Sequence, residues 1–222
     1  MGNELQNYAN ELKKINFLET NEPPVSQFFH GLRMRIDQDK GQGWSEILRI
    51  HNGLYVALVD YRLNHRLETC HGNAQPFFHF TILLSGHAEF QVSKQAKQTL
   101  APGDVWFVHG PFEKISRTQF PDEKIRGLSI DLPRELIEAW LGTSGCAASS
   151  GLEKLAVEFV GQQAIPLARG LQHSSEFMRI ARELVYARRQ TLADNLRFES
   201  LALDLLSRIL TLGDSSADSS ME

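Results

Sequence analysis

Apolar residues recur along the chain with two different periods, which divide the sequence into regions of different secondary structure. Near the N-terminus, apolar side chains spaced by three and four positions predict an amphipathic helix. They are Leu5, Tyr8, Leu12 and Ile15. From residue 44 to residue 132 the period shortens to two, and β-branched and aromatic residues fill runs such as 54–61 and 77–84. We therefore expect a helical N-terminal arm over 1–43 and a β region over 44–132.

Tight turns separate the predicted strands of the β region. Gly86 precedes a strictly alternating stretch at 87–92, and the Pro-Gly-Asp sequence at 102–104 precedes a strand at 105–108. Glycine admits positive φ, proline fixes φ, and the aspartate side chain accepts a hydrogen bond within the turn. A further strand is predicted over 126–132. Because no helix interrupts these strands, they indicate an antiparallel barrel or sandwich rather than a parallel sheet.

The last third of the chain shows helical patterns. We predict a short helix over 133–142, a small-residue linker over 143–151, and a second helix from residue 174 or 175 to about residue 189. A third helix is expected from Asp194, its N-cap, to residue 212. The region 133–212 is thus a helical packing and dimerisation region. The serine-rich, acidic tail over 213–222 is predicted to be disordered.

Composition narrows the class of protein. A chain of 222 residues can bury a sizeable core. Its net charge of -4 with scattered lysines and arginines disfavours direct DNA binding, which depends on basic side chains that neutralise phosphates. The longest apolar runs are far shorter than the roughly 20 residues of a membrane-spanning helix. With two distant cysteines and no secretion signal, a reduced, cytoplasmic protein that binds no membrane is expected.

Two segments carry a resemblance to known proteins. Residues 78–86 and 100–111, with the Pro-Gly-Asp turn inside the second, resemble the strand-glycine-strand pattern of cupin barrels. The order of a barrel, a short helix and a helical pair resembles the N-terminal half of bacterial AraC/XylS-type transcription regulators, particularly the siderophore-responsive branch. The resemblance implies a mainly β fold with C-terminal helices: a cupin-like antiparallel β-barrel, or double-stranded β-helix, followed by a helical hairpin.

The same resemblance implies a function without catalysis. A small-molecule effector, such as a siderophore chelate or an aromatic metabolite, is expected to bind in the barrel and to modulate a DNA-binding domain. That domain, a pair of helix-turn-helix units in the family, is absent from this chain, either cut away or naturally missing. DNA is therefore a partner only through the absent domain, and the chain itself is expected to form a homodimer. No cofactor is implied.

Candidate site residues follow from strand alternation and side-chain chemistry. Aromatic and polar side chains on the predicted strands combine an apolar body with a hydrogen-bonding tip, as a barrel ligand requires. They are Trp44, Tyr55, Tyr61, His79, Thr81, Trp106 and His109. Plain core packing is the alternative, because alternation does not say which face is inside. The leucine-rich last helix is expected to pack on the barrel and on a partner subunit, with an intramolecular hairpin as the alternative. Its candidate dimer residues are Leu201, Leu205, Ile209 and Leu212.

Two other functions stay open at this point. A metal-dependent cupin enzyme needs histidine and glutamate ligands, but His79 stands where the motif glutamate belongs and residues 72–75 stand where its two histidines belong. A set of His79, Glu113 and one more histidine is the remaining way to bind iron or zinc, and we expect no metal site. The third possibility is a degenerate barrel that serves only to dimerise, for which a filled interior would be evidence.

Overall fold

A computed structural model describes residues 18–22, 26–51, 53–93, 96–142, 167–172 and 175–215. Strands make up most of this part of the chain. They are β1 (Leu18–Glu22), β2 (His30–Ile36), β3 (Gly41–Arg49), β4 (Tyr55–Leu63), β5 (Leu67–Ser85), β6 (Ala88–Val92), β7 (Gln98–Leu100), β8 (Asp104–Gln119), β9 (Lys124–Pro133) and β10 (Leu167–Gln172). The helices are α2 (Arg134–Gly142), α4 (Ser175–Val185) and α5 (Leu192–Ser215). None of the helices in these ranges is both long enough and apolar enough to cross a membrane.

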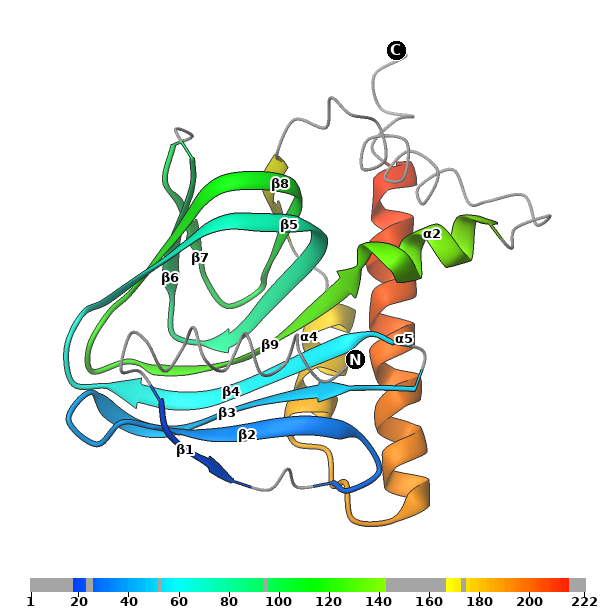
Figure 1. The fold of residues 1–222 in the computed structure, drawn as a ribbon, viewed down its shortest axis with the longest axis horizontal. Coiled ribbons are helices and arrows are strands. Elements are labelled where there is room, and N and C mark those ends of the chain that lie inside the picture. The colour runs from blue at the N-terminus through cyan, green and yellow to red at the C-terminus, as the bar shows by residue number, and fades with distance from the viewer. Residues whose placement is uncertain are drawn as a thin grey trace.

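The ten strands form one antiparallel sheet in the order β1-β2-β3-β4-β9-β5-β8-β6-β7, and β10 pairs with β8. No pairing among the described strands joins β1 to β7, so the closed barrel expected from the sequence is not formed here. The sheet instead curls (Figure 1), as large twisted sheets do. Its two ends face each other, because Met34 of β2 and Phe90 of β6 belong to one apolar cluster.

The curled sheet has two apolar faces. The inner face carries a core that includes Tyr61, Leu83, Phe90 and Trp106. The outer face packs against α4 and α5 through alternate residues of the same strands, such as Phe80 and Ile82 of β5. Figure 1 shows α4 and α5 beside the sheet. Strand alternation thus assigns odd-numbered β5 residues from 79 to 83 to the inner face and even-numbered ones to the helices.

Several local predictions are confirmed. The backbone of Gly86 has φ +76° and that of Gly103 has φ +99°, in the two turns predicted from glycine. In the second turn, the Asp104 carboxylate accepts a hydrogen bond from the Ala101 backbone N–H at 3.0 Å. The last residue of α2 is Gly142, as expected. The helix α4 buries the predicted apolar stripe. Its buried residues are Phe177, Ile180, Ala181, Leu184 and Val185.

The two ends of the chain differ from the expectation or lie outside the described residues. The predicted helix over 1–17, the linker over 143–151 and the last residues of the tail, 216–222, are outside. Strands β1 and β2 occupy part of the predicted helical arm, so the sheet begins before residue 44. The third helix starts at Leu192, before the predicted Asp194, and runs through Ser215.

Candidate functional site

A chain of polar side chains on the inner face joins β5 to β9. The register pairs His79 with Asp131 and Thr81 with Ser129, which places all four side chains on one face. His79 Nδ1 lies 2.5 Å from Asp131 Oδ1, and His79 Nε2 lies 2.6 Å from Thr81 Oγ1. Thr81 Oγ1 lies 3.1 Å from Ser129 Oγ. The structure therefore brings the predicted site residues His79 and Thr81 together. It adds two polar residues, Asp131 and Ser129, that the sequence analysis did not single out.

The bonding pattern fixes the orientation of the His79 ring. In the tautomer that donates Nδ1–H to Asp131, Nε2 accepts a hydrogen bond from the Thr81 hydroxyl. The Ser129 hydroxyl can then donate to Thr81. The side chains of His79 and Asp131 are 22% and 33% exposed, whereas Thr81 is buried. The polar chain thus begins at a solvent-accessible end and leads into the interior.

Trp106 forms the apolar neighbour of this polar chain. Its ring meets the His79 ring in a T-shaped contact with centroids 6.3 Å apart, and it stacks on Phe90 at 3.8 Å. The indole N–H donates to Gln98 Oε1 at 3.2 Å. Because Trp106 is only 2% exposed, it packs in the core and presents little free surface. His79, Thr81 and Trp106 therefore form one contiguous part of the inner face.

The other predicted ligand residues lie apart from this group. Tyr61 is buried on the inner face, where its hydroxyl accepts a hydrogen bond from the Gln119 side-chain amide. Tyr55 packs against the same core at a partly exposed position. Trp44 lies on the opposite, helix-facing side under the Arg33 guanidinium, 4.0 Å from its ring centroid. His109 pairs through its backbone with Phe78, and its side chain is outside the described residues.

Two surface grooves in the described part of the chain border predicted or neighbouring residues, and neither of these two is lined by His79, Thr81 or Trp106. One, bordered by Trp44, Asp60 and Lys124, is open and shallow. The other lies between Phe28 and Asn195, beside the start of α5. Among the described residues, no three or more histidine, cysteine, aspartate or glutamate side chains lie close enough together to hold a metal ion.

One buried ion pair and one more exposed polar contact join the helices to the sheet. The Arg189 guanidinium, which follows α4, lies 2.5 Å from the Glu46 carboxylate of β3, and both side chains are buried. Desolvation by burial lowers the pKa of Arg189, which the Glu46 charge partly offsets. His51 binds Glu199 of α5 through its backbone N–H and its ring. The helical pair is therefore attached to the sheet by polar as well as apolar contacts.

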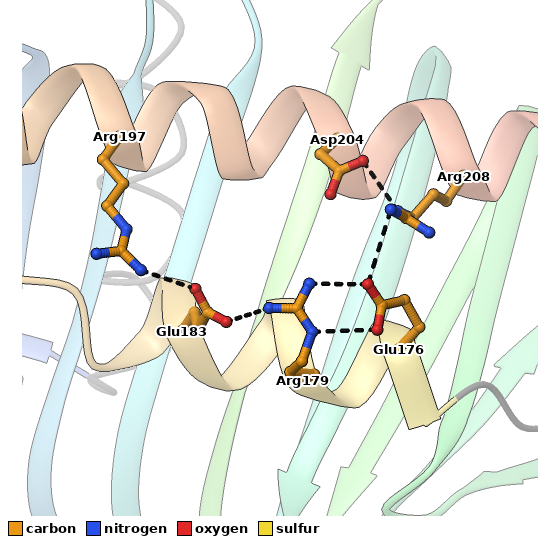
Figure 2. Close-up of polar contacts among 6 residues, drawn as sticks. All are labelled: Glu176, Arg179, Glu183, Arg197, Asp204 and Arg208. Carbon is orange, nitrogen blue, oxygen red and sulfur yellow. Dashed lines mark hydrogen bonds and ion pairs between the residues drawn. The ribbon is translucent and has the colours of Figure 1, made fainter.

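A ladder of ion pairs runs along the exposed seam between α4 and α5 (Figure 2). Arg179 donates to Glu176 at 2.8 Å and also binds Glu183, which in turn accepts from Arg197 of α5. Hydrogen bonding from Arg179 lowers the pKa of Glu176. Exposed pairs of this kind contribute little individually, so the ladder acts mainly to fix the register of the two helices.

The predicted dimer residues of α5 face the sheet. Leu205 and Ile209 are buried in the helix-facing core, and Leu201 packs partly buried against it. The side chain of Leu212 is outside the described residues. Among the α5 leucines whose side chains the structure describes, those that are exposed are instead Leu192, Leu196 and Leu203. Their spacing of four and seven residues places them on one stripe of the helix.

The sequence analysis missed Ser129 and Asp131, although both fall in the strand predicted over 126–132. Strand alternation already places them on one face, but it does not show that this strand pairs with β5. A partner carboxylate for His79 can be found only from the register, which is a tertiary property.

Comparison with known proteins gives the family. Residues 40–221 match the family described as the regulatory protein PchR N-terminal domain. The chain belongs to this family and is a regulatory N-terminal domain of an AraC-type transcription regulator. No curated protein matches the sequence.

Solved structures show weaker likenesses. The AraC-like transcriptional activator CuxR matches with 11% identity and a TM-score of 0.33, over 74% of this chain and 56% of that one. ToxT from Vibrio cholerae has 12% identity and a TM-score of 0.36, over 65% and 55%. Oxalate decarboxylase has 14% identity and a TM-score of 0.33, over 71% and 46%. The chain thus spans about half the length of these structures, and likeness at this level carries no argument about its fold or function.

Proposed function

We propose that this chain is the effector-sensing and dimer-forming domain of an AraC-type regulator that acts in the cytoplasm. A small molecule, such as a siderophore chelate or an aromatic metabolite, binds at the inner face of the curled sheet, which we assign as an open variant of the cupin-like barrel. The observation that carries the proposal is the polar chain from Asp131 through His79 to Thr81, which is accessible at one end and bordered by Trp106.

Strand β9 offers a direct route from the effector to the helices. Ser129 and Asp131 belong to the polar chain, while the alternate residues Leu128, Ile130 and Leu132 pack in the core that includes α4 and α5. A ligand that binds Asp131 therefore acts one residue away from the helix contacts. By favouring one of two packings of β9 on the helices, it changes how an attached DNA-binding domain is presented.

A homodimer is the second part of the proposal. The stripe of Leu192, Leu196 and Leu203 supports it, because these side chains are 61%, 52% and 37% exposed on a single helix. Pairing this stripe with its copy buries apolar surface on both subunits without disturbing the intramolecular core. The ion-pair ladder lies along the α4 side of α5 and stays accessible.

Thermal unfolding tests the ligand site. We expect one or more ferric siderophore chelates or aromatic metabolites to raise the melting temperature, since a ligand at 100 times its Kd contributes about 2.7 kcal/mol to the native state. The substitution His79→Ala should abolish the rise. His87→Ala is the matched control, because His87 forms a similar pair with Glu123, 2.6 Å away and outside the polar chain. An equal ligand effect in both variants would exclude His79 from the site.

A metal-dependent enzyme is the other candidate. We infer a regulatory rather than catalytic role from the family. If elemental analysis of the purified protein found stoichiometric iron, zinc, manganese or nickel, the metal-dependent enzyme would be favoured instead.

A further inference from the structure

Arg117 is a cation on the inner face of the sheet, and no anionic partner for it occurs among the described residues. It lies on β8 and pairs through its backbone with Phe90 of β6 and Thr69 of β5. Both of these side chains are buried. Ile115 and Gln119, two residues away on either side, also face inward: Ile115 packs against the inner core, and Gln119 donates to Tyr61. Strand alternation therefore places Arg117 on this face as well.

The contacts of Arg117, which is partly buried, differ from those of the buried Arg189. The Nε of Arg117 is buried and has no hydrogen-bond partner, and within the described part of the chain Arg117 forms no ion pair. Arg189 also has an unpartnered Nε, but the Glu46 carboxylate neutralises its charge. Among the described residues, the Arg117 guanidinium contacts the Phe90 ring, whose centroid is 5.5 Å from the guanidinium carbon. A buried N–H donor without an acceptor costs free energy, and a ligand oxygen that accepts from Arg117 Nε would offset this cost.

The surroundings of Arg117 are apolar and aromatic. Phe90 stacks on Trp106, which contacts His79, so successive ring contacts connect the cation to the polar chain. Leu67 and Ile115 add partly exposed apolar surface to the same core. A guanidinium presents two parallel N–H donors that match a carboxylate, and the neighbouring rings match an aromatic body.

We infer that the effector carries a carboxylate on an aromatic body, and that Arg117 binds this carboxylate. The inference rests on the proposed sensing function and narrows its ligand class. Arg117 supplies affinity for the charged end, and the polar chain at His79 recognises a separate polar group.

Fluorine NMR with a matched pair of probes tests this assignment. 4-Fluorobenzoate and 4-fluorobenzamide differ in charge but hardly in shape, and line broadening of the fluorine signal reports binding of each. We expect benzoate to bind the wild-type domain about 10- to 100-fold more tightly than the amide, as a charge-assisted pair contributes. Arg117→Gln should remove this preference, and Arg117→Lys should retain part of it, because lysine keeps the charge and loses the planar fork.

Arg66→Gln is the matched control. Arg66 is exposed and has its guanidinium 5.7 Å from the Phe120 ring, so the variant removes the same charge and a similar ring contact away from the inner face. It should keep the preference for benzoate. A structural role of Arg117 would instead lower the melting temperature of Arg117→Gln without ligand and leave the preference intact, which would overturn the inference.

The remaining outcomes separate the inference from the proposed function. If siderophore chelates or neutral metabolites stabilise the domain through His79 while Arg117→Gln binds them and benzoate as the wild type does, the sensing function stands and the carboxylate assignment fails. If inorganic phosphate or sulfate competes with benzoate at equal ionic strength, Arg117 takes any oxyanion and the assignment to carboxylates is wrong. If the wild type binds no probe of either set, both proposals fail.

Discussion

The carboxylate of Glu46 on β3 lies 2.5 Å from the guanidinium of Arg189, and these two buried side chains join the sheet to the connection between α4 and α5. The residues are 143 positions apart in the chain. Arg33 approaches the same carboxylate at 3.4 Å from β2, so one anion serves two cations. This pair adds a buried ionic contact to the apolar packing between the sheet and the helices.

Breaking this pair should destabilise the domain strongly. We expect Glu46→Gln to cost about 3–5 kcal/mol in the free energy of unfolding, because it leaves Arg189 buried without a counter-charge. The double variant Glu46→Leu with Arg189→Met should be markedly more stable than Glu46→Gln. Urea unfolding measures both. Asp204→Ala, which breaks the exposed pair with Arg208, is the control and should cost less than about 1 kcal/mol. A similar cost for the buried and exposed pairs would contradict the prediction.

The start of α5 should respond to pH through Asp194. Thr191 and Asp194 form a capping box, in which the Asp194 carboxylate accepts from the Thr191 N–H at 3.0 Å and the Thr191 hydroxyl accepts from the Asp194 N–H at 3.1 Å. The hydrogen bond from the Thr191 N–H lowers the pKa of Asp194 below its ordinary value. A depressed folded-state pKa means that the stabilisation is present above about pH 4 and is lost as pH falls through the folded pKa.

We therefore expect Asp194→Asn to melt below the wild type at pH 7 and the two melting curves to converge as the carboxylate is protonated. Thr191→Ala should lower the free energy of unfolding by about 0.5–2 kcal/mol, the usual value for an N-cap, both at pH 7 and at a pH where the Asp194 carboxylate is protonated. A pH-independent difference between Asp194→Asn and the wild type would show that the carboxylate charge has no role in the cap.

Gly86 should tolerate no side chain. Its φ is +76°, and an added Cβ would lie 2.5 Å from Ile125 Cδ1 and 3.0 Å from the Lys124 carbonyl oxygen. Gly53 also has a positive φ, of +95°, but its Cβ would meet only Leu136 at 3.8 Å. We expect Gly53→Ala to cost about 1–2 kcal/mol from backbone strain alone and Gly86→Ala to cost more. The difference in stability between the two variants, measured by thermal unfolding, gives the cost of the steric clash at Gly86. Equal costs would show that the clash contributes nothing.

The leucine stripe on α5 predicts the oligomeric state. We expect the wild-type domain to sediment as a dimer and Leu196→Glu to sediment as a monomer, because a charge in an apolar interface is costly to desolvate. Ser175→Glu adds the same charge at an exposed position at the start of α4, away from the stripe, and should leave the dimer intact. Circular dichroism of both variants should match the wild type. A dimer in Leu196→Glu would place the interface elsewhere.

Much of the local structure could be predicted from the sequence. The alternation at 87–92 gave β6 and its inner residues, and the spacing of apolar residues in α4 gave its buried stripe. These features depend on the period of side-chain directions within one element, which the sequence contains directly. The same reasoning gave the wrong cap for α5, since Thr191 and Asp194 are both capping residues and spacing alone does not choose between them.

The long-range features could not be predicted in this way. Leucines surround much of α5, so the pattern does not distinguish Leu205, which faces the sheet, from Leu203, which faces solvent. Trp44 and Tyr61 are similar aromatic candidates on neighbouring strands, and only the register puts them on opposite faces of the sheet.

By itself, the sequence determined the mainly β composition, the glycine turns, the helices that follow the sheet and the likeness to AraC-type regulators, because these depend on neighbouring residues and their order. Only the tertiary structure decided that the sheet is open, that Asp131 is the partner of His79, and that Arg117 faces inward with no anion beside it in the described part of the chain. The physical reason is that strand pairing brings together side chains whose separation along the chain carries no record of their contact.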